Sequence, residues 1–342
     1  MPPTIREVAE RADVSVSTVS RVLNDYPHVS EEARGRVLEA MGELEYRPDV
    51  AARSMRTGTS RAVGFVVSDI SNPLFSVIAK GADVVLHPRG YSFVLATSRN
   101  DPEREAELFS ALRQRRVDGL IVAVADERAP SLAERLATFQ GCVLFDREVP
   151  GSSADAVCSD HAAGMAQALA HLAGLGHRRV ALIAGSQVQL GSRARVAAFR
   201  KHAARLGLER DRRLVRTGEL SRETGYLAAR ELLSLDAPPT ALVAGNNQLT
   251  VGVVGALHDL GLRVPDDLSL VACDDVDLTR LHDPPIDVID RDPLELGRLA
   301  AELLLERLAD RDAPVRRVTA PTTFVRRAST GVPALAEEVR SA

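Results

Sequence analysis

Residues 4–24, TIREVAERADVSVSTVSRVLN, decide the fold of the first part of the chain. Thr4 is placed to cap a first helix, and Ser15 to cap a second one after a turn at residues 13–14. The first helix carries an apolar stripe formed by Val8, Ala9 and Ala12. The second helix has inward-facing apolar residues at spacings of three and four, namely Val19, Val22 and Leu23. This pattern predicts a helix-turn-helix.

The second helix leaves Val16, Ser17, Ser20 and Arg21 facing outward near its start. A helix-turn-helix that binds DNA carries its base-contacting side chains at these positions. An amphipathic helical hairpin without a DNA role would show the same apolar spacing, so both interpretations are open on this segment alone.

The composition indicates a chain of two or three compact units with aliphatic cores. It has 342 residues, of which 45% are hydrophobic, no tryptophan and a formal net charge of −4. Residues 1–60 hold eight arginines and ten acidic residues, so this part is slightly acidic. That balance disfavours non-specific DNA binding by bulk charge, although it permits arginines gathered on one face.

The cysteines and the N-terminus indicate a protein of a reducing compartment. Cys142, Cys158 and Cys273 fit neither a zinc spacing nor a disulfide framework, and we expect them to be small buried hydrophobes. Residues 1–10 lack the pattern of a signal peptide. No stretch approaches the roughly 18 apolar residues of a membrane span. We therefore expect a cytoplasmic protein.

The chain divides into a first unit, a linker and a core. The first unit is expected at residues 1–47, with a third helix capped by Ser30. Residues 48–60 are expected to form a linker with about eight potentially helical residues, below the ~12–15 at which an isolated helix becomes even marginally stable. Such a segment needs a partner to become ordered.

From residue 61 onward, short apolar runs alternate with helical stretches. The runs are AVGFVV (62–67), SFVLAT (92–97), GLIVAV (119–124), CVLFD (142–146), AVCSD (156–160), RVALIAG (179–185), ALVAG (241–245) and LSLVACDD (268–275). Helices are expected over 75–88, 103–115, 161–174, 193–206, 222–235, 248–260 and 293–309. This alternation predicts parallel sheets covered on both faces, with ligands bound beyond the carboxyl ends of the strands.

The order and spacing of several segments resemble the lactose-repressor (LacI-type) family of bacterial transcription regulators. The segments are TVSRVLN (18–24), VSEEARGRVLEAMGELEYRPDVAARSMRTGTS (29–60), SNPLF (71–75), DGLIV (118–122), HLAGLGHRRVALIAG (171–185), GNNQLTVGVVGAL (245–257), VPDDLSLVACDD (264–275) and PP (284–285). The resemblance implies an all-α helix-turn-helix head, a hinge helix and an α/β core of two lobes with parallel sheets, as in periplasmic binding proteins. We expect the first lobe at about 61–160 plus 291–322, and the second at about 161–290 plus 323–342.

The resemblance also implies a homodimer, or a tetramer, that binds a pseudo-palindromic DNA operator. The DNA-binding positions that carry over are Thr4, Ser15, Val16, Ser17, Thr18, Ser20, Arg21, Asn24 and Val29 in the head, and Ala52, Arg53, Met55 and Arg56 in the hinge. Arg21 suits a guanine or a phosphate equally well. Met55 stands where the family has a leucine wedge, Asp13 where it has glycine and Asp49 where it has asparagine. A solvated linker is the alternative for the hinge.

The core is expected to bind an effector between its lobes. The positions that match the family's effector contacts are Asp69, Phe75, Asp146, Arg147, Arg195, Asn246, Asp274 and Arg291. Carboxylate, amide and guanidinium groups together suit a polyhydroxylated ligand such as a sugar or sugar derivative, with Phe75 able to stack on it.

Each of these residues also has an interpretation that needs no ligand. Arg195 could form a surface ion pair, Asp146 and Arg147 could pair only with each other, and Asp274 with Asp275 could form a turn or bind a metal. Within the core, four residues depart from the family pattern: Asn247, His161, Arg291 and Asp287. Because Arg291 and Asp287 add charge, an acidic sugar or a phosphorylated ligand is also possible. His87, His171 and His177 are expected at the surface or at helix caps.

The sequence therefore predicts a DNA-binding repressor controlled by a small molecule that closes the two lobes, acting as an inducer or a corepressor. A solute-binding protein without a regulatory DNA role is the alternative. An enzyme is disfavoured because no phosphate-binding, dinucleotide or nucleophile-elbow motif is present. We expect no catalytic residue, metal or cofactor. The C-terminal tail is too short for a confident coiled coil, which favours a dimer.

Overall fold

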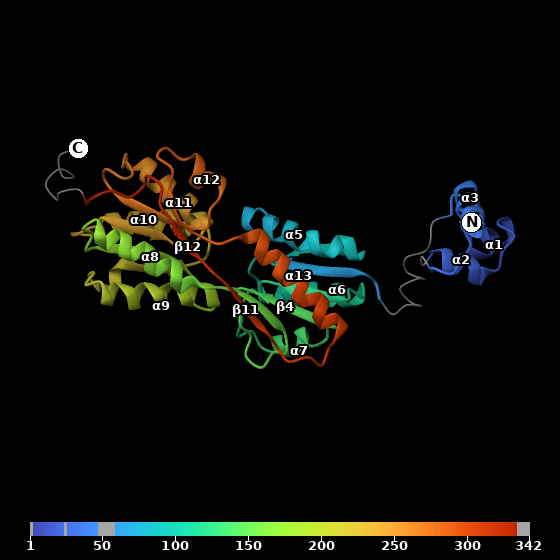
Figure 1. The fold of residues 1–342 in the computed structure, drawn as a ribbon. Helices are drawn as coiled ribbons and strands as arrows, with labels where there is room; N and C mark the ends of the chain where they lie inside the picture. Colours follow the sequence, from blue (N-terminus) through green and yellow to red (C-terminus); the bar gives the residue numbers. More distant parts are fainter. Residues whose placement is uncertain (1–2, 24–25, 47–58, 334–342) are drawn as a thin grey trace. The chain divides into compact units, whose positions relative to one another are not determined.

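The computed structural model describes residues 3–23, 26–46 and 59–333, in two compact units, Met1–Ser60 and Arg61–Ala342. The elements of both units are labelled in Figure 1. The predicted hinge residues Asp49, Ala52, Arg53, Met55 and Arg56 lie outside the described residues, as do Asn24 and the C-terminal tail from residue 334.

The first unit contains the predicted helix-turn-helix and the predicted third helix. Its helices are α1 (Ile5–Arg11), α2 (Val16–Leu23) and α3 (Glu31–Glu43). Thr4 and Glu7 form a reciprocal capping box on α1, which satisfies backbone N–H groups that the first turn leaves free. The core of the unit is built around Val8, Val19 and Val37, all fully buried. These contacts confirm the sequence-based arrangement of the head.

The turn between α1 and α2 requires a residue whose backbone adopts the left-handed helical conformation. Asp13 has a φ of 50°, a region that glycine adopts without cost and that aspartate tolerates better than most residues. The departure from glycine at this position is therefore accommodated without a change of turn.

The second unit consists of two lobes, each built on a six-stranded sheet (Figure 1). The first sheet has the order β11-β5-β4-β3-β1-β2 and is entirely parallel. Its strands are β1 (Ala62–Val67), β2 (Ser92–Thr97), β3 (Gly119–Val122), β4 (Gly141–Phe145), β5 (Asp155–Ser159) and β11 (Arg317–Ala320). The helices of this lobe are α5 (Pro73–Leu86), α6 (Pro102–Gln114), α7 (Leu132–Leu136) and α13 (Pro293–Ala309), with a 3-10 turn at His87–Arg89.

The second sheet has the order β12-β10-β9-β8-β6-β7, parallel except for β12. Its strands are β6 (Val180–Gly185), β7 (Val215–Gly218), β8 (Ala241–Ala244), β9 (Ser269–Cys273), β10 (Asp287–Asp290) and β12 (Thr323–Val325). The helices are α8 (His161–Gly174), α9 (Leu190–Arg205), α10 (Arg222–Leu233), α11 (Asn247–Asp259) and α12 (Asp277–Leu281), with a 3-10 turn at Arg212–Leu214. The chain crosses between the lobes three times, after β5, after β10 and after β11.

Helices cover both faces of each sheet, as the apolar runs predicted. In the first lobe α5 and α13 pack on one face and α6 and α7 on the other. In the second lobe α10 and α11 cover one face and α8 and α9 the other. The helix pairs approach closely at glycines: a Cβ on Gly81 of α5 would lie 2.0 Å from the carbonyl oxygen of Leu294 in α13. The three cysteines are free and buried, as expected. In the described part of the chain no helix combines the length and apolarity needed to cross a membrane.

Candidate functional site

The second helix of the head presents a polar, exposed face at its N-terminal end. Ser15 caps the helix through the backbone N–H of Thr18, with 3.1 Å between the nitrogen and Ser15 Oγ. Val16, Ser17 and Arg21 are exposed. Thr4 and Val29, also expected at DNA, have structural roles here, because Thr4 caps α1 and Val29 packs against the core of the head. The exposed face offers an apolar, a hydroxyl and a guanidinium group, which are suited to base edges and phosphates.

The core contains a cleft of about 610 Å³ at the carboxyl ends of the strands of both sheets. Its lining includes all eight residues predicted to bind an effector. Asp69 follows β1, Asp146 follows β4, Asn246 follows β8 and Asp274 follows β9, while Arg291 follows β10 at a crossing between the lobes. The topology therefore gathers side chains that are up to 222 positions apart in sequence, as the strand-end rule predicted. Their role in ligand binding stays a prediction.

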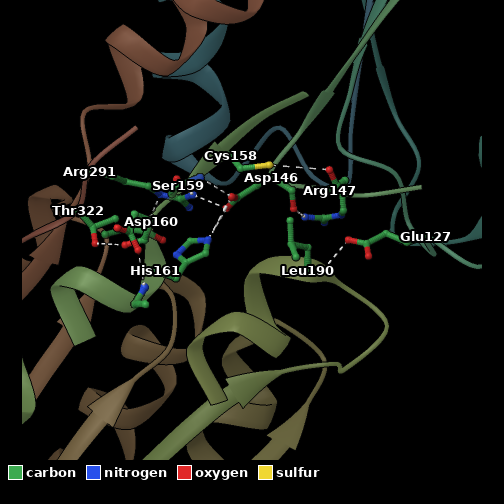
Figure 2. Close-up of polar contacts among 12 residues, drawn as sticks. Glu127, Asp146, Arg147, Cys158, Ser159, Asp160, His161, Leu190, Arg291 and Thr322 are labelled. Carbon is green, nitrogen blue, oxygen red and sulfur yellow. Dashed lines mark hydrogen bonds and ion pairs between the residues drawn. The ribbon is translucent and has the colours of Figure 1, made fainter. Parts of the chain in front are cut away.

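Asp146 is the centre of the buried polar network at the base of the cleft (Figure 2). Its Oδ1 accepts a hydrogen bond from the backbone N–H of Ser159 at 2.9 Å, and its Oδ2 pairs with Arg291 Nη1 at 2.6 Å. His161 Nε2 lies 3.1 Å from Oδ1 and 2.9 Å from Oδ2. Burial alone would raise the pKa of this carboxyl, but its hydrogen bond with His161 and its ion pair with Arg291 hold it well below its usual value. Asp146 is therefore a fully satisfied carboxylate.

Arg291 joins the lobes by pairing with a carboxylate from each. Besides Asp146 of the first lobe, its Nε donates to Asp274 Oδ1 of the second lobe at 2.9 Å. All three side chains are at most 7% exposed. Asp274 has a φ of 73°, and its other oxygen, Oδ2, is buried with no hydrogen-bond partner. The charge that Arg291 adds to the cleft is thus largely neutralised within the protein.

The structure excludes two interpretations that needed no ligand. Asp146 and Arg147 do not pair through their charges, because the guanidinium of Arg147 donates to the carbonyl oxygens of Val124 and Asp146. Arg195 is not a surface residue: it is 6% exposed and lines the cleft. Arg147 is held by carbonyl oxygens of its own lobe, and Arg195 is buried because it lines the cleft.

The neighbour of Asp274 belongs to a separate ion-pair cluster. Asp275 pairs with Arg280 and Arg327 and accepts a hydrogen bond from Thr279, so its charge is satisfied within the second lobe. Among the described residues no group of three histidine, cysteine or acidic side chains is placed to hold a metal ion.

Two of the histidine predictions need correction. His87 is exposed at the C-terminal cap of α5, as expected. His177, however, is fully buried and bonds to Thr240 Oγ1, Ser269 Oγ and the carbonyl oxygen of Gly331. His171 is mostly buried and contacts Thr330 Oγ1 at 2.8 Å. Both fasten the segment after β12 to the second lobe, a role that local sequence does not reveal.

Asp287 lies away from the cleft, although its charge had suggested an acidic or phosphorylated ligand. It is fully buried at the start of β10 and accepts hydrogen bonds from Ser329, Thr330 and the backbone N–H of Arg327. The segment 327–330 satisfies the charge of Asp287, so this charge gives no indication of the chemical class of the ligand.

Sequence reasoning singled out Asn247 as a departure from the family pattern, but it did not predict the contacts that fasten the lobes to each other. Asn247 Nδ2 donates to Asn72 Oδ1 at 2.7 Å, and Asn247 Oδ1 is buried without a partner. On another side, Glu127 accepts from the backbone N–H of Leu190 at 2.5 Å (Figure 2). It also accepts from the guanidinium of Arg193 at 2.6 Å. Further lining residues that were missed include Arg99, Gln189 and Glu219 in loops after strands, and Arg222 and Glu223 in the first turn of α10. The only available signal was their place after a strand.

Comparison with known proteins identifies relatives over nearly the whole chain. Residues 4–49 match the model of bacterial regulatory proteins of the lacI family, and residues 169–330 match a periplasmic binding protein-like domain. The HTH-type transcriptional repressor PurR of Haemophilus influenzae (strain PittEE) is 32% identical over 315 residues, covering 92% of this chain and 94% of the repressor.

Two solved structures have the same architecture. The lac repressor dimer bound to operator and the anti-inducer ONPF superposes with a TM-score of 0.85 at 28% identity, covering 97% of this chain and all of that one. The complex of the transcriptional regulator CelR with cellobiose gives a TM-score of 0.72 at 30% identity, covering 96% and 99% of the two chains.

Proposed function

The chain belongs to the lacI family of bacterial regulatory proteins, and from this premise we propose that it is a transcriptional repressor whose operator binding is controlled by a small molecule in the cleft. The observation that carries the proposal is the combination, in one chain, of an exposed reading face on α2 and a polar cleft between two lobes. Of the relatives named above, PurR and the lac repressor are repressors and CelR is a transcriptional regulator; the lac repressor is seen with operator DNA and CelR with cellobiose.

The DNA partner is a pseudo-palindromic operator read by a homodimer. Two copies of α2 then enter adjacent major grooves, one helical turn apart. Val16 and Ser17 contact base edges, and Arg21 contacts a guanine or a phosphate. The predicted hinge residues extend this contact into the minor groove, with Met55 as the apolar wedge. A protein with this partner works in the cytoplasm, where the chromosome lies.

The ligand is a sugar or sugar derivative that binds without being transformed. Its hydroxyl groups both donate and accept hydrogen bonds, which suits a lining of carboxylates, amides and guanidinium groups. The contacts across the lobes, such as Asn72 with Asn247, form only when the lobes are close together. A ligand that prefers one lobe arrangement shifts the equilibrium between two states of the dimer, and this shift changes the affinity for DNA.

Selection of genomic fragments by the full-length protein tests the DNA role. At near-physiological salt we expect enrichment of a pseudo-palindrome with half-sites about one helical turn apart. Arg21→Ala should weaken binding to the enriched site by about tenfold, in line with ~1–3 kcal/mol for a base-contacting arginine. Arg36→Ala, which removes an exposed arginine from α3, is the charge-matched control and should have little effect.

The alternative is a solute-binding protein without a regulatory DNA role. It would bind a small molecule in the cleft yet enrich no fragment, either alone or with sugars present. That result would overturn the proposed function and support the alternative.

A further inference from the structure

The charged lining of the cleft divides into a buried and an exposed half. Ten of the lining residues are charged, and five of them are exposed: Asp69, Arg99, Glu219, Arg222 and Glu223. Water and salt screen these five. The other five are at most 8% exposed: Asp146, Arg147, Arg195, Asp274 and Arg291. The buried half thus has three guanidinium groups against two carboxylates.

The neighbouring titratable groups do not supply the missing negative charge in full. His161 is neutral near pH 7, because burial and the charge of Arg195 lower its pKa. Glu127, near Arg147, is already paired with Arg193. Glu105 also interacts with Arg147, but burial raises its pKa to about 7, so it carries only part of a charge near neutrality. The buried end of the cleft therefore keeps an excess of positive charge.

The hydrogen-bonding groups still available to a ligand at this end of the cleft are mostly donors. Asp146 is saturated by Ser159, His161 and Arg291, so it has no strong acceptor left for a ligand. Asp274 keeps a single unpartnered oxygen, Oδ2, which is buried. An unpartnered buried oxygen costs free energy until a donor reaches it.

The available donors come from two side chains of the second lobe. Arg195, on α9, forms none of the ion pairs found among the described residues, and it lines the cleft and a small adjoining cavity together with Asp274. Asn246 uses its Oδ1 to accept from the backbone N–H of Leu249, so its amide N–H₂ group remains. Gly191 keeps the space beside this network open, since a Cβ there would lie 3.1 Å from His161 Nε2 and 3.3 Å from Asp146 Oδ2.

We propose that the effector is a sugar acid of the aldonate class, whose carboxylate binds Arg195 and whose neighbouring hydroxyl donates to Asp274 Oδ2. This proposal rests on the proposed function and specifies its ligand. A carboxylate supplies the acceptors that the site lacks, and its single negative charge matches the excess of one guanidinium. The adjacent hydroxyl supplies the one donor that Asp274 needs. A neutral sugar leaves the excess charge uncompensated, and a phosphate dianion overcompensates it.

Titration calorimetry with the full-length protein tests the proposal. The probes are aldonates of several hexoses and pentoses, the parent aldoses and the aldose phosphates. We expect at least one aldonate to bind about 100-fold more tightly than its parent aldose, the scale that charge-assisted hydrogen bonds in a buried site provide. An aldose or an aldose phosphate that binds as tightly as the best aldonate overturns the proposal.

Variants locate the two contacts. Arg195→Gln should abolish the preference for the aldonate over the aldose. Arg200→Gln, which changes an exposed arginine on the same helix, is the matched control and should keep the preference. Asp274→Asn should weaken both ligands while the preference remains, which keeps the test informative if Arg195→Gln fails to fold. Preference that survives Arg195→Gln in a folded protein overturns the assignment.

Operator binding separates this proposal from the proposed function. If the protein binds an operator but no aldonate, the ligand class is wrong and the regulator stands. If an aldonate binds with the stated preference but no operator is found, the ligand class stands and the regulator is wrong.

Discussion

Replacing Arg291 by glutamine should destabilise the protein strongly, because it removes the cation shared by two buried carboxylates. Arg291 Nη1 lies 2.6 Å from Asp146 Oδ2 and its Nε lies 2.9 Å from Asp274 Oδ1. Breaking a buried ion pair by removing one partner costs ~3–5 kcal/mol, since the remaining charge stays buried. Glutamine can replace one hydrogen bond but no charge. We therefore expect a loss of about 3 kcal/mol or more in the free energy of unfolding.

The chain contains a matched control for this change. Arg298, on α13, also bridges two carboxylates, Glu295 at 2.9 Å and Glu302 at 2.8 Å. These three side chains are about 40% exposed. Exposed pairs contribute roughly 0–1 kcal/mol, so Arg298→Gln should cost less than about 1 kcal/mol. Both variants remove an arginine that bridges two carboxylates, and they differ chiefly in burial; Arg291 also donates to Ser159 Oγ at 3.2 Å.

Urea denaturation followed by circular dichroism measures both changes, and its pH dependence tests the cause. In the wild type the pKa of Asp146 is depressed, so its stabilising effect persists until the pH falls far below neutrality. In Arg291→Gln one of the charges that oppose the effect of burial is gone, so the pKa of Asp146 should be higher than in the wild type. The deficit of the variant should therefore shrink as the pH falls, because Asp146 becomes protonated at a higher pH in the variant than in the wild type. A cost below 1 kcal/mol, or a deficit that grows on acidification, would refute the reasoning.

Three further predictions concern buried groups elsewhere in the core. Burial raises the pKa of Glu105 from 4.5 to about 7, so the stability of the wild type falls as the pH rises through this interval. The variant Glu105→Gln should therefore be more stable than the wild type by about 2–3 kcal/mol at pH 8.5 and equally stable at pH 4.5. Urea titration measures both differences. An unchanged difference across this range would contradict the assignment. Gly81→Ala places a Cβ against the backbone of α13 and should lower the thermal midpoint, whereas Gly35→Ala, where the space is open, should not. Asn247→Asp replaces the amide donor to Asn72 with an acceptor, so the lobes should separate and the radius of gyration in solution scattering should rise; an unchanged radius would show that this contact does not hold them.

The regular elements of the core were predictable because their signal is local. The eight apolar runs became strands, since a strand covered on both faces must be apolar throughout. The shorter strands β7, β10, β11 and β12 were missed. They have three or four residues, and β11 alternates exposed and half-buried positions at a sheet edge. Their pairing is set by distant strands, which no local pattern records.

The cleft was predictable in outline and not in its connections. The place of Asp146 and Asp274 after strands put them at one edge of the sheets. Their partners could not be read from the sequence, because Arg291 lies 145 positions from Asp146 and meets it only where the chain crosses between lobes. The same distance explains the error on His177, which is buried against a segment 154 positions away.

The proposed control of operator binding by the cleft ligand is tested most directly by the affinity of the full-length protein for its selected operator. This affinity is measured with and without a saturating cleft ligand. We expect the ligand to change the operator dissociation constant at least fivefold. Because the coupling between two sites is reciprocal, the operator should change the affinity for the ligand by the same factor. Equal operator affinities in both conditions, with each partner shown to bind alone, would contradict the proposed control.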